Sequence, residues 1–218
     1  MDNEIILVGG FHEMIELCEK AGFIIKGIID GNLRESYCGY PVIGSDEDAE
    51  KLFPEYGKYK LVLSPDSPKV RTKLEQLYSA IGYDYATVIS PNATISKFAT
   101  IGKGTVVQDF VNVSAGTKIG SFVKLNTYCN VMHDNIVGDF STIAPNAVSL
   151  GRITIGKSSY IGANATILPG LSVGGNVTVG AGAVVTHNIP TNEIWAGCPA
   201  SKLVNNKQSA DNKPVINL

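Results

Sequence analysis

The stretch from Ile89 to Val185 follows a six-residue pattern of apolar and polar positions without interruption. Every sixth position is Ile, Val or Leu with one exception, Ser149, and the position four residues further on is mostly small or β-branched. A short fixed period indicates a unit that cannot bury its own apolar face and must stack on its neighbours. Six residues fit neither a helical face at 3.6 residues per turn nor a simple two-faced alternating strand, but they suit a short strand followed by a corner. The repeated positions are Ile89, Ile95, Ile101, Val107, Val113, Ile119, Leu125, Val131, Val137, Ile143, Ser149, Ile155, Ile161, Ile167, Val173, Val179 and Val185.

This pattern predicts a parallel β-helix built of hexapeptide repeats. Three strands close one triangular coil with the repeated column pointing inward, so the stretch makes about five coils and, at roughly 4.8 Å per coil, a prism about 25 Å long. Glycine follows the column position in many units, where a corner requires either close approach of the backbone or a positive φ angle. These glycines are Gly102, Gly120, Gly138, Gly156, Gly162, Gly174 and Gly180.

The residues before the repeat alternate between short apolar runs and helix-like stretches, which predicts a small parallel sheet. Ligands of such a sheet bind at the carboxyl ends of its strands, here near Gly10, Asp30 and Ser64 to Asp66. Pro41 is expected to lie in a turn. We expect strands at 4–8, 23–29 and 60–63, helices at 13–20, 46–53 and 68–81, and a bridging strand at 84–88.

The composition changes from mixed charge to repeat after Gly82, which divides the chain. We expect an α/β domain over residues 1–84, a β-helix over 85–204 whose last coil is capped by 187–199, and a polar, frayed tail over 205–218.

The composition excludes several classes of function. With 218 residues, 44% of them hydrophobic, the chain can form one large domain or two small ones. A net charge of −2 without a basic block predicts no binding to nucleic acid or to an anionic membrane. No apolar run approaches the roughly 20 residues of a membrane span and no signal peptide is evident, so a cytoplasmic location is the default expectation. The four cysteines lie far apart with no CxxC spacing, which argues against a zinc knuckle or a redox pair.

The chain has only three histidines, so few residues can act as a base near neutral pH. His133 belongs to a repeat corner, where its ring can point outward, and the polar residues Asn126, Asn130, Asp134 and Asn135 lie close to it in the sequence. A solvated turn histidine would fit the same residues.

The run His133-Asp134-Asn135-Ile136-Val137-Gly138-Asp139, followed by Gly151 and then by Ile155-Gly156, resembles the active-site coil of the sialic-acid-operon and bacillosamine-pathway acetyltransferases. The resemblance implies a left-handed β-helix, a homotrimer with the active site between subunits, and acetyl-CoA as co-substrate without a metal. It also implies that His133 is the general base, that Asp134 orients and polarises it, and that Gly151 offers a backbone N–H near the thioester carbonyl.

The resemblance assigns further residues to the binding sites. Asn126 matches an asparagine of the acceptor site, whereas Thr142 stands where many relatives carry a second histidine of the acetyl pocket. Ala163 and Ala181 fall in the late coils that line the acetyl-CoA groove. Residues 180–185 and 196–200 look like the family's last coil and terminus.

The N-terminal half resembles the family's Rossmann-like domain, which holds the nucleotide-linked sugar. Relatives open with Gly-x-Gly-Gly-His, whereas this chain reads Val8-Gly9-Gly10-Phe11-His12, so two of the motif's glycines are missing. The phosphate-binding role therefore falls to Gly9, Gly10 and the start of the following helix, where His12 aligns with the family's histidine. Asp30 matches an aspartate of the family that contacts the nucleoside, and Ser64 and Asp66, which follow the third strand, are weaker candidates.

The resemblance therefore implies N-acetylation of a nucleotide-linked amino sugar, such as a 4-amino-deoxy sugar of glycan biosynthesis, by direct transfer. Acetyl-CoA is already activated, so alignment, one base and one oxyanion donor suffice. O-acetylation of a hydroxylated sugar or metabolite stays open, as does a non-catalytic trimeric scaffold. A γ-type carbonic anhydrase would need several zinc-binding histidines on adjoining coils, and only His133 and His187 lie in or beside the repeat.

Overall fold

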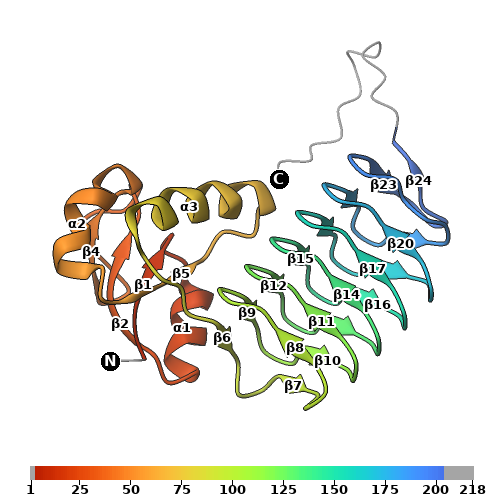
Figure 1. Ribbon diagram of the computed structural model, residues 1–218, viewed down its shortest axis with the longest axis horizontal. Helices are drawn as coiled ribbons and strands as arrows, with labels where there is room; N and C mark the ends of the chain where they lie inside the picture. The colour runs from red at the N-terminus through yellow and green to blue at the C-terminus, as the bar shows by residue number, and fades with distance from the viewer. Residues whose placement is uncertain (1–2, 204–218) are drawn as a thin grey trace, which may run out of the picture.

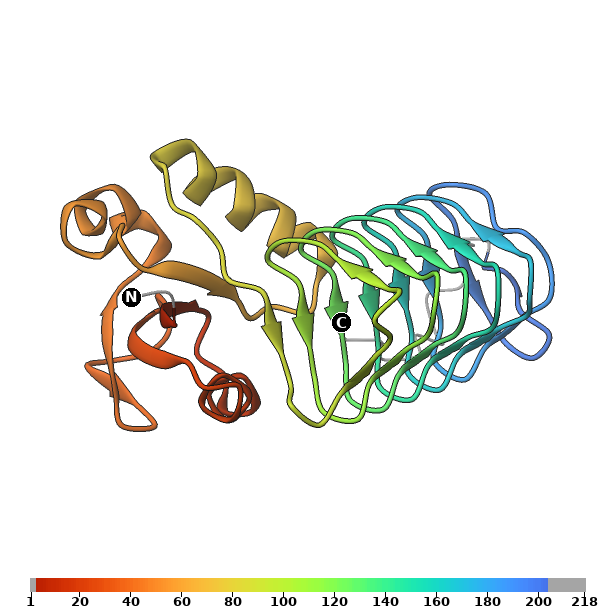
Figure 2. The same ribbon diagram turned by 60° about the horizontal axis from the view of Figure 1, so that its bottom comes forward.

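The computed structural model describes residues 3–203, so the expected tail lies outside the described residues. An α/β domain packs against one side of a long triangular prism, at its first coils (Figure 1). Figure 2 shows how the coils of the prism stack one upon another.

The N-terminal domain is built on a five-stranded sheet in the order β3-β4-β2-β1-β5, parallel except for the β3–β4 hairpin. The three predicted strands are confirmed, but the hairpin was not expected: Pro41 lies inside a strand, and the turn falls at Cys38-Gly39. Proline is compatible with this place because β2 pairs with β4 only from Val42 onward, so Pro41 need not donate a hydrogen bond to β2. The strands are β1 (Glu4–Val8), β2 (Ile24–Ile29), β3 (Ser36–Tyr37), β4 (Tyr40–Gly44) and β5 (Lys60–Leu63).

Helices cover both faces of this sheet. Helix α1 (His12–Lys20) packs on one face, while α2 (Ala49–Tyr56), which follows the 3₁₀ turn η1 (Asp46–Asp48), and α3 (Pro68–Ile81) pack on the other. Helix α3 has the predicted bounds because its ends carry clear signals: the Ser67 hydroxyl caps the first turn, and Gly82 ends the helix with a φ of 110°.

The second part of the chain is a prism with three walls of parallel strands, in which strand residues from β6 to β22 pair with the residue 18 positions further on. In the last coil the spacing falls to 16, as between Thr178 and Ile194. Wall I consists of β6 (Val88–Ile89), β9 (Val106–Val107), β12 (Lys124–Leu125), β15 (Thr142–Ile143), β18 (Tyr160–Ile161), β21 (Thr178–Val179), β23 (Ile194–Ala196) and the antiparallel β24 (Ser201–Lys202). Wall II consists of β7 (Thr94–Ile95), β10 (Asn112–Val113), β13 (Asn130–Val131), β16 (Val148–Ser149), β19 (Thr166–Ile167) and β22 (Val184–Val185). Wall III consists of β8 (Thr100–Ile101), β11 (Lys118–Ile119), β14 (Ile136–Val137), β17 (Thr154–Ile155) and β20 (Ser172–Val173).

The predicted column is the core of the prism. Every one of its positions is the second residue of a strand, from β6 to β22, and from Val107 onward all of them are buried. In the first coil the burial is incomplete, and Ile89 is still 37% exposed, because the end coil has a neighbouring coil on one side only.

The corner glycines serve close approach rather than backbone torsion. None of the glycines that follow the column has a positive φ; a Cβ at Gly138 would lie 2.5 Å from the backbone nitrogen of Lys157 on the next coil. The positive φ angles fall two residues later, mostly on residues with side chains, such as Asp134 and Arg152, both at 60°.

The first coils share their core with the N-terminal domain. Val88 and Val106 of wall I pack into the cluster under α1, and Phe122 and Phe140 join the cluster under α3. The last two rings stack on each other with centroids 5.1 Å apart. The two parts of the chain therefore bury apolar surface against each other.

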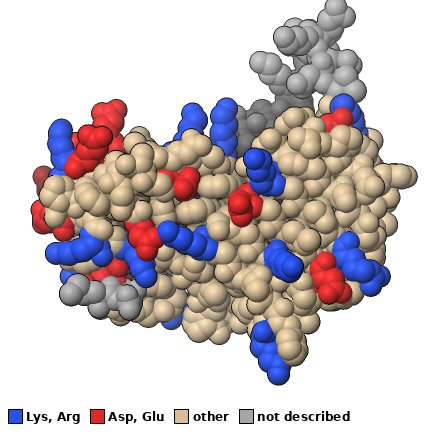
Figure 3. Space-filling model, in the orientation of Figure 1, with Lys and Arg blue, Asp and Glu red and all other residues tan. Residues whose placement is uncertain are grey.

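Charges of both signs are interspersed on the face drawn in Figure 3. Among residues 3–203 no helix is long and apolar enough to cross a membrane.

Ser149 is the one polar member of the core column, and its buried hydroxyl has no hydrogen-bond partner. We predict that Ser149→Val stabilises the protein by about 1–3 kcal/mol, because it removes an unpaired buried hydroxyl and adds apolar contacts with Val131 and Ile167. Thermal unfolding should show a melting temperature raised by several degrees. Ile167→Ala, one coil further along the same wall, is the control and should destabilise by about 2–5 kcal/mol. A lower melting temperature for Ser149→Val would contradict this account of the position.

Candidate active site

A histidine and a carboxylate form a pair at the II/III edge, the corner between walls II and III. His133 and Asp134 follow β13, and Nδ1 of His133 lies 2.9 Å from Oδ2 of Asp134. Their side chains are 47% and 60% exposed, so a ligand can reach them. With the carboxylate accepting a hydrogen from Nδ1, the neutral ring presents Nε2 as a proton acceptor.

The neighbouring coils fix the orientation of this pair. Gly151 lies one coil above His133, and a Cβ there would come within 2.5 Å of Nε2 of the imidazole. Gly116 lies one coil below Asp134, and a Cβ there would collide with its carboxylate. The two side chains therefore occupy space that only glycine leaves free.

Gly151 also contributes a polar group to this edge. Its carbonyl accepts from Gly170, whereas its N–H donates to no backbone carbonyl among residues 3–203. An N–H without a backbone partner beside Nε2 of a histidine is suited to a developing oxyanion.

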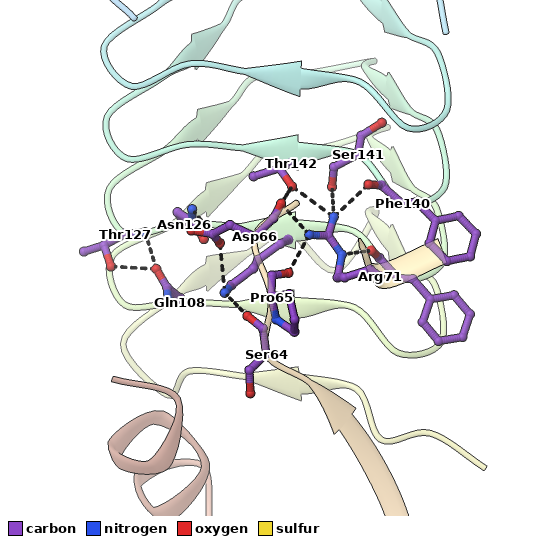
Figure 4. A network of polar contacts seen from close by, with 12 residues as sticks. Ser64, Pro65, Asp66, Arg71, Gln108, Asn126, Thr127, Phe140, Ser141 and Thr142 are labelled. Atoms are coloured by element: carbon purple, nitrogen blue, oxygen red, sulfur yellow. Dashed lines mark hydrogen bonds and ion pairs between the residues drawn. The ribbon is translucent and has the colours of Figure 1, made fainter. Parts of the chain in front are cut away.

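A second cluster of polar groups lies where the N-terminal domain meets wall I (Figure 4). The ammonium of Lys124, a residue only 2% exposed, binds the carbonyl of Ser64 at 2.6 Å and the carboxylate of Asp66 at 2.9 Å. Nδ2 of Asn126 donates to the same carboxylate at 3.3 Å. Its Oδ1 and the hydroxyl of Ser64 are buried without hydrogen-bond partners.

Arg71 holds this junction together from α3. Its buried guanidinium donates to the carbonyls of Pro65 and Asp66 and, on the prism, to those of Phe122, Phe140 and Ser141. Burial lowers the pKa of Arg71 to about 10, although the carboxylate of Asp66 acts in the opposite direction. Burial likewise lowers the pKa of Lys124, and Asp66 again opposes the shift.

Thr142 belongs to the same junction. Its hydroxyl accepts from Arg71 at 2.9 Å and donates to the carbonyl of Asp66 at 2.7 Å, and the residue is completely buried. The structure therefore places Thr142 under the loop of residues 64–67, where it joins the two domains within one chain.

The candidate residues of the N-terminal domain gather at the carboxyl edge of its sheet. Gly9, with a φ of 91°, follows β1 beside Ser64, and the N–H of Gly10 donates to the carboxylate of Asp30 at 2.9 Å. Nδ1 of His12, at the start of α1, lies 2.6 Å from the hydroxyl of Tyr37. The backbone N–H of Gly10 is thus already engaged, while no side chain caps the first turn of α1.

The candidate residues of the prism lie on two different edges. Asn126, Ala163 and Ala181 follow strands of wall I at the I/II edge, whereas His133 and Gly151 lie at the II/III edge. Within one chain wall II separates the two groups.

Sequence reasoning missed Arg71 and Lys124. Lys124 occupies an outward position of a short strand, and Arg71 belongs to a helix rich in charged residues, so both patterns are typical of solvated side chains. Only the packing of the two domains buries them.

The four cysteines differ in exposure, since Cys38 and Cys198 are exposed. Cys18 and Cys129 are buried, which raises the pKa of the Cys18 thiol to about 12 and that of Cys129 as well. Within residues 3–203 there is no group of three or more His, Cys, Asp or Glu side chains that could hold a metal ion.

Known proteins share this architecture. A family model described as the hexapeptide repeat of succinyl-transferase matches residues 152–187. The acetyltransferase domain of PglB from Neisseria gonorrhoeae, solved in complex with acetyl coenzyme A, is 32% identical with a TM-score of 0.86, and the match covers 93% of this chain and all of that one. The chain belongs to the hexapeptide-repeat sugar acetyltransferases. The fold class is thereby confirmed: an α/β domain with a Rossmann-like sheet precedes a left-handed parallel β-helix.

The descriptions of two further relatives include a nucleotide-linked sugar, GDP-perosamine. PerB from Caulobacter crescentus, solved with CoA and GDP-perosamine, is 26% identical to this sugar acetyltransferase with a TM-score of 0.86, and the match covers 92% of this chain and 97% of that one. GDP-perosamine N-acetyltransferase from Escherichia coli O157:H7 is 33% identical over 85 residues, which are 39% of this chain and 38% of that relative.

We predict that Gly151→Ala lowers kcat/KM for acetyl transfer by about 100-fold, because the added methyl group displaces the ring of His133 from its place beside Asp134. Steady-state kinetics measures the loss. Gly175→Ala is a matched control, since a Cβ there comes no closer than 3.3 Å to another atom. Transfer within twofold of wild type in Gly151→Ala would show that the ring does not depend on this glycine.

Proposed function

We propose that the protein transfers the acetyl group of acetyl-CoA to the amino group of a nucleotide-linked 4-amino-deoxy sugar. The observation that carries the proposal is the fixed arrangement of His133, Asp134 and Gly151 at an exposed corner, in a chain whose relatives bind CoA and a nucleotide-linked amino sugar. O-acetylation would use the same base but lacks a relative among those described above.

The residues of the corner account for each step of a direct transfer. The amine attacks the thioester carbonyl, and Nε2 of His133 takes the proton that the nitrogen loses. The N–H of Gly151 donates to the oxyanion of the tetrahedral intermediate. Its collapse breaks the carbon–sulfur bond, and the protonated imidazole returns the proton to the CoA thiolate. Asp134 stabilises the imidazolium that exists between the two proton transfers.

The nucleotide-linked sugar fits the edge of the N-terminal sheet. The uncapped first turn of α1, with His12 and the bend at Gly9-Gly10, suits the phosphate groups. Asp30 suits a hydroxyl of the nucleoside, and the sugar would lie toward the junction that holds Ser64 and Asn126.

The separation of the two edges supports a site formed between subunits. His133 and Gly151 would then act on a sugar bound beside Asn126 of a neighbouring subunit, with Ala163 and Ala181 of that neighbour lining the acetyl-CoA groove. A homotrimer with threefold symmetry makes three such sites.

CoA release from acetyl-CoA over a panel of UDP-, GDP- and dTDP-linked amino sugars tests the reaction. We predict turnover of one acceptor and a loss of about 10²–10⁴-fold in His133→Ala, because the amine then lacks its base. His12→Ala, which leaves the corner intact, should weaken nucleotide-sugar binding and spare the chemical step. The same turnover in His133→Ala as in wild type would refute the assignment of the base.

Mixed trimers test the shared site. His133→Ala and Asn126→Ala chains, each inactive alone, should recover about a third of wild-type activity when coexpressed and purified through two different tags, since each mixed trimer has one site in three that combines both intact residues. Light scattering verifies the trimer. A site contained within one chain would recover nothing.

A further inference from the structure

A small pocket lies between helix α1 and the I/II edge of the prism. Its volume is about 140 Å³. This is less than the roughly 300–1,000 Å³ of a complete small-molecule site, so the pocket suits one part of a larger ligand. Two carboxylates line it from α1, and an amide, an aromatic ring and a hydroxyl line it from the prism: Glu13, Glu16, Gln108, Phe110 and Thr127. Thr127 directly follows Asn126, so the pocket adjoins the place proposed for the acceptor sugar.

The amide of Gln108 has one engaged end and one free end. The residue is 8% exposed, and its Oε1 accepts from the N–H of Thr127 at 2.9 Å and from the hydroxyl of Thr127 at 3.0 Å (Figure 4). Because a backbone N–H can only donate, these bonds identify the amide oxygen and fix the place of Nε2. Nε2 donates to no group within the part of the chain that the structure describes. Unlike Oδ1 of Asn126, it keeps contact with solvent, so a ligand can reach it.

The register of the prism places Gln108 in the column of the acceptor site. Gln108 and Asn126 are 18 residues apart, and the strands before them pair in register, so the two amides occupy the same corner of successive coils. Two residues further along each coil, Phe110 stacks on Tyr128 with centroids 4.8 Å apart and 13° between the rings. Both aromatic residues are about half exposed. The I/II edge therefore presents an amide donor beside an open aromatic surface.

Carboxylate, amide and aromatic groups together suit a sugar ring. A hydroxyl group can donate to a carboxylate while it accepts from an amide, and the C–H face of the ring can pack on an aromatic side chain. Glu13 and Glu16 lie three residues apart on α1 and thus on one face of the helix. Neither carboxylate has a cation within 4 Å among residues 3–203.

Resting on the proposed function, we propose that Gln108 is a specificity-determining residue for the acceptor sugar. Its Nε2 donates to one ring hydroxyl, the same hydroxyl donates to Glu13, and the ring of Phe110 packs against the C–H face of the sugar. A site that hydrogen-bonds a hydroxyl rejects an analogue that lacks it, because the groups of the site are then left unpaired.

The test removes the donor of the amide and keeps its acceptor. Gln108→Glu retains an oxygen for the N–H of Thr127 but loses the N–H groups, and Gln108→Met has a similar length without either polar atom. The acceptor with the highest turnover in the panel of UDP-, GDP- and dTDP-linked amino sugars is compared with analogues in which one ring hydroxyl at a time is replaced by hydrogen. For one analogue, wild type should show kcat/KM at least about 10-fold below that of the parent sugar.

Both variants should use that analogue and the parent sugar within about twofold of each other, with the loss for the parent sugar in KM rather than kcat. The ratio of the two substrates is decisive, because a general effect of the substitution on the fold or on the charge of the pocket lowers both alike. Gln76→Glu is the matched control: this glutamine is exposed on α3 and outside the pocket, so discrimination should equal that of wild type.

The possible failures can be told apart. If both variants of Gln108 keep the wild-type ratio, or if wild type rejects none of the analogues, Gln108 does not recognise the sugar, while the proposed function stands. Calorimetry with the nucleoside diphosphate alone should give the same affinity for wild type and Gln108→Met; a weaker affinity would assign the pocket to the nucleotide and overturn the proposal. If wild type releases CoA with no acceptor of the panel, the proposed function itself fails and the role of Gln108 falls with it.

Discussion

The register of the prism is the constraint on which the site depends. Each coil between β6 and β22 contains 18 residues. Every side chain at a corner there lies directly between the residues 18 positions before and after it. The side chain of His133 therefore lies against Gly151, and that of Asp134 against Gly116, because the backbone register fixes both positions. An insertion of a single residue between two of these positions would move a side chain to another face of its strand and break the stack. The geometry of the candidate site is thus a consequence of repeat length.

The N-terminal domain is attached by charge as well as by apolar contact. Two buried cations, Arg71 and Lys124, meet at the junction, and the only carboxylate that pairs with either among the described residues is Asp66, which is 54% exposed. Burial of a cation is costly unless hydrogen bonds replace its hydration. Arg71 receives such compensation from carbonyl groups of both domains, so the loop of residues 64–67 cannot move independently of the prism. The sugar side of the proposed site is thereby held at a fixed place relative to wall I.

Much of the fold could be predicted because its signals are local and repeated. The column positions, the bounds of α3 and the three main strands of the N-terminal sheet follow from periodicity and from caps. The β3–β4 hairpin was not predicted because its strands are short and one contains proline. The burial of Arg71 and Lys124 was not predicted for a different reason. The residues around a charged side chain in the sequence give no sign that a distant segment will cover it. Thr142 was expected at the acetyl pocket by resemblance, and its contacts with Arg71 and Asp66 could not be foreseen from one strand.

The spacing of 18 residues also determines which candidate site residues lie on the same face of the prism. This follows without any resemblance to known proteins. Lys124, Thr142, Tyr160 and Thr178 differ by 18 and form one column on the outside of wall I. The first two of these lie under the N-terminal domain, and the last two line an open cleft beyond it. Ala163 and Ala181 form a second column, at the I/II edge, and His133 with Gly151 a third, at the II/III edge. Wall II lies between the I/II edge, with Asn126, and the II/III edge, with His133, so the proposal that both act on one substrate requires them to come from two different chains.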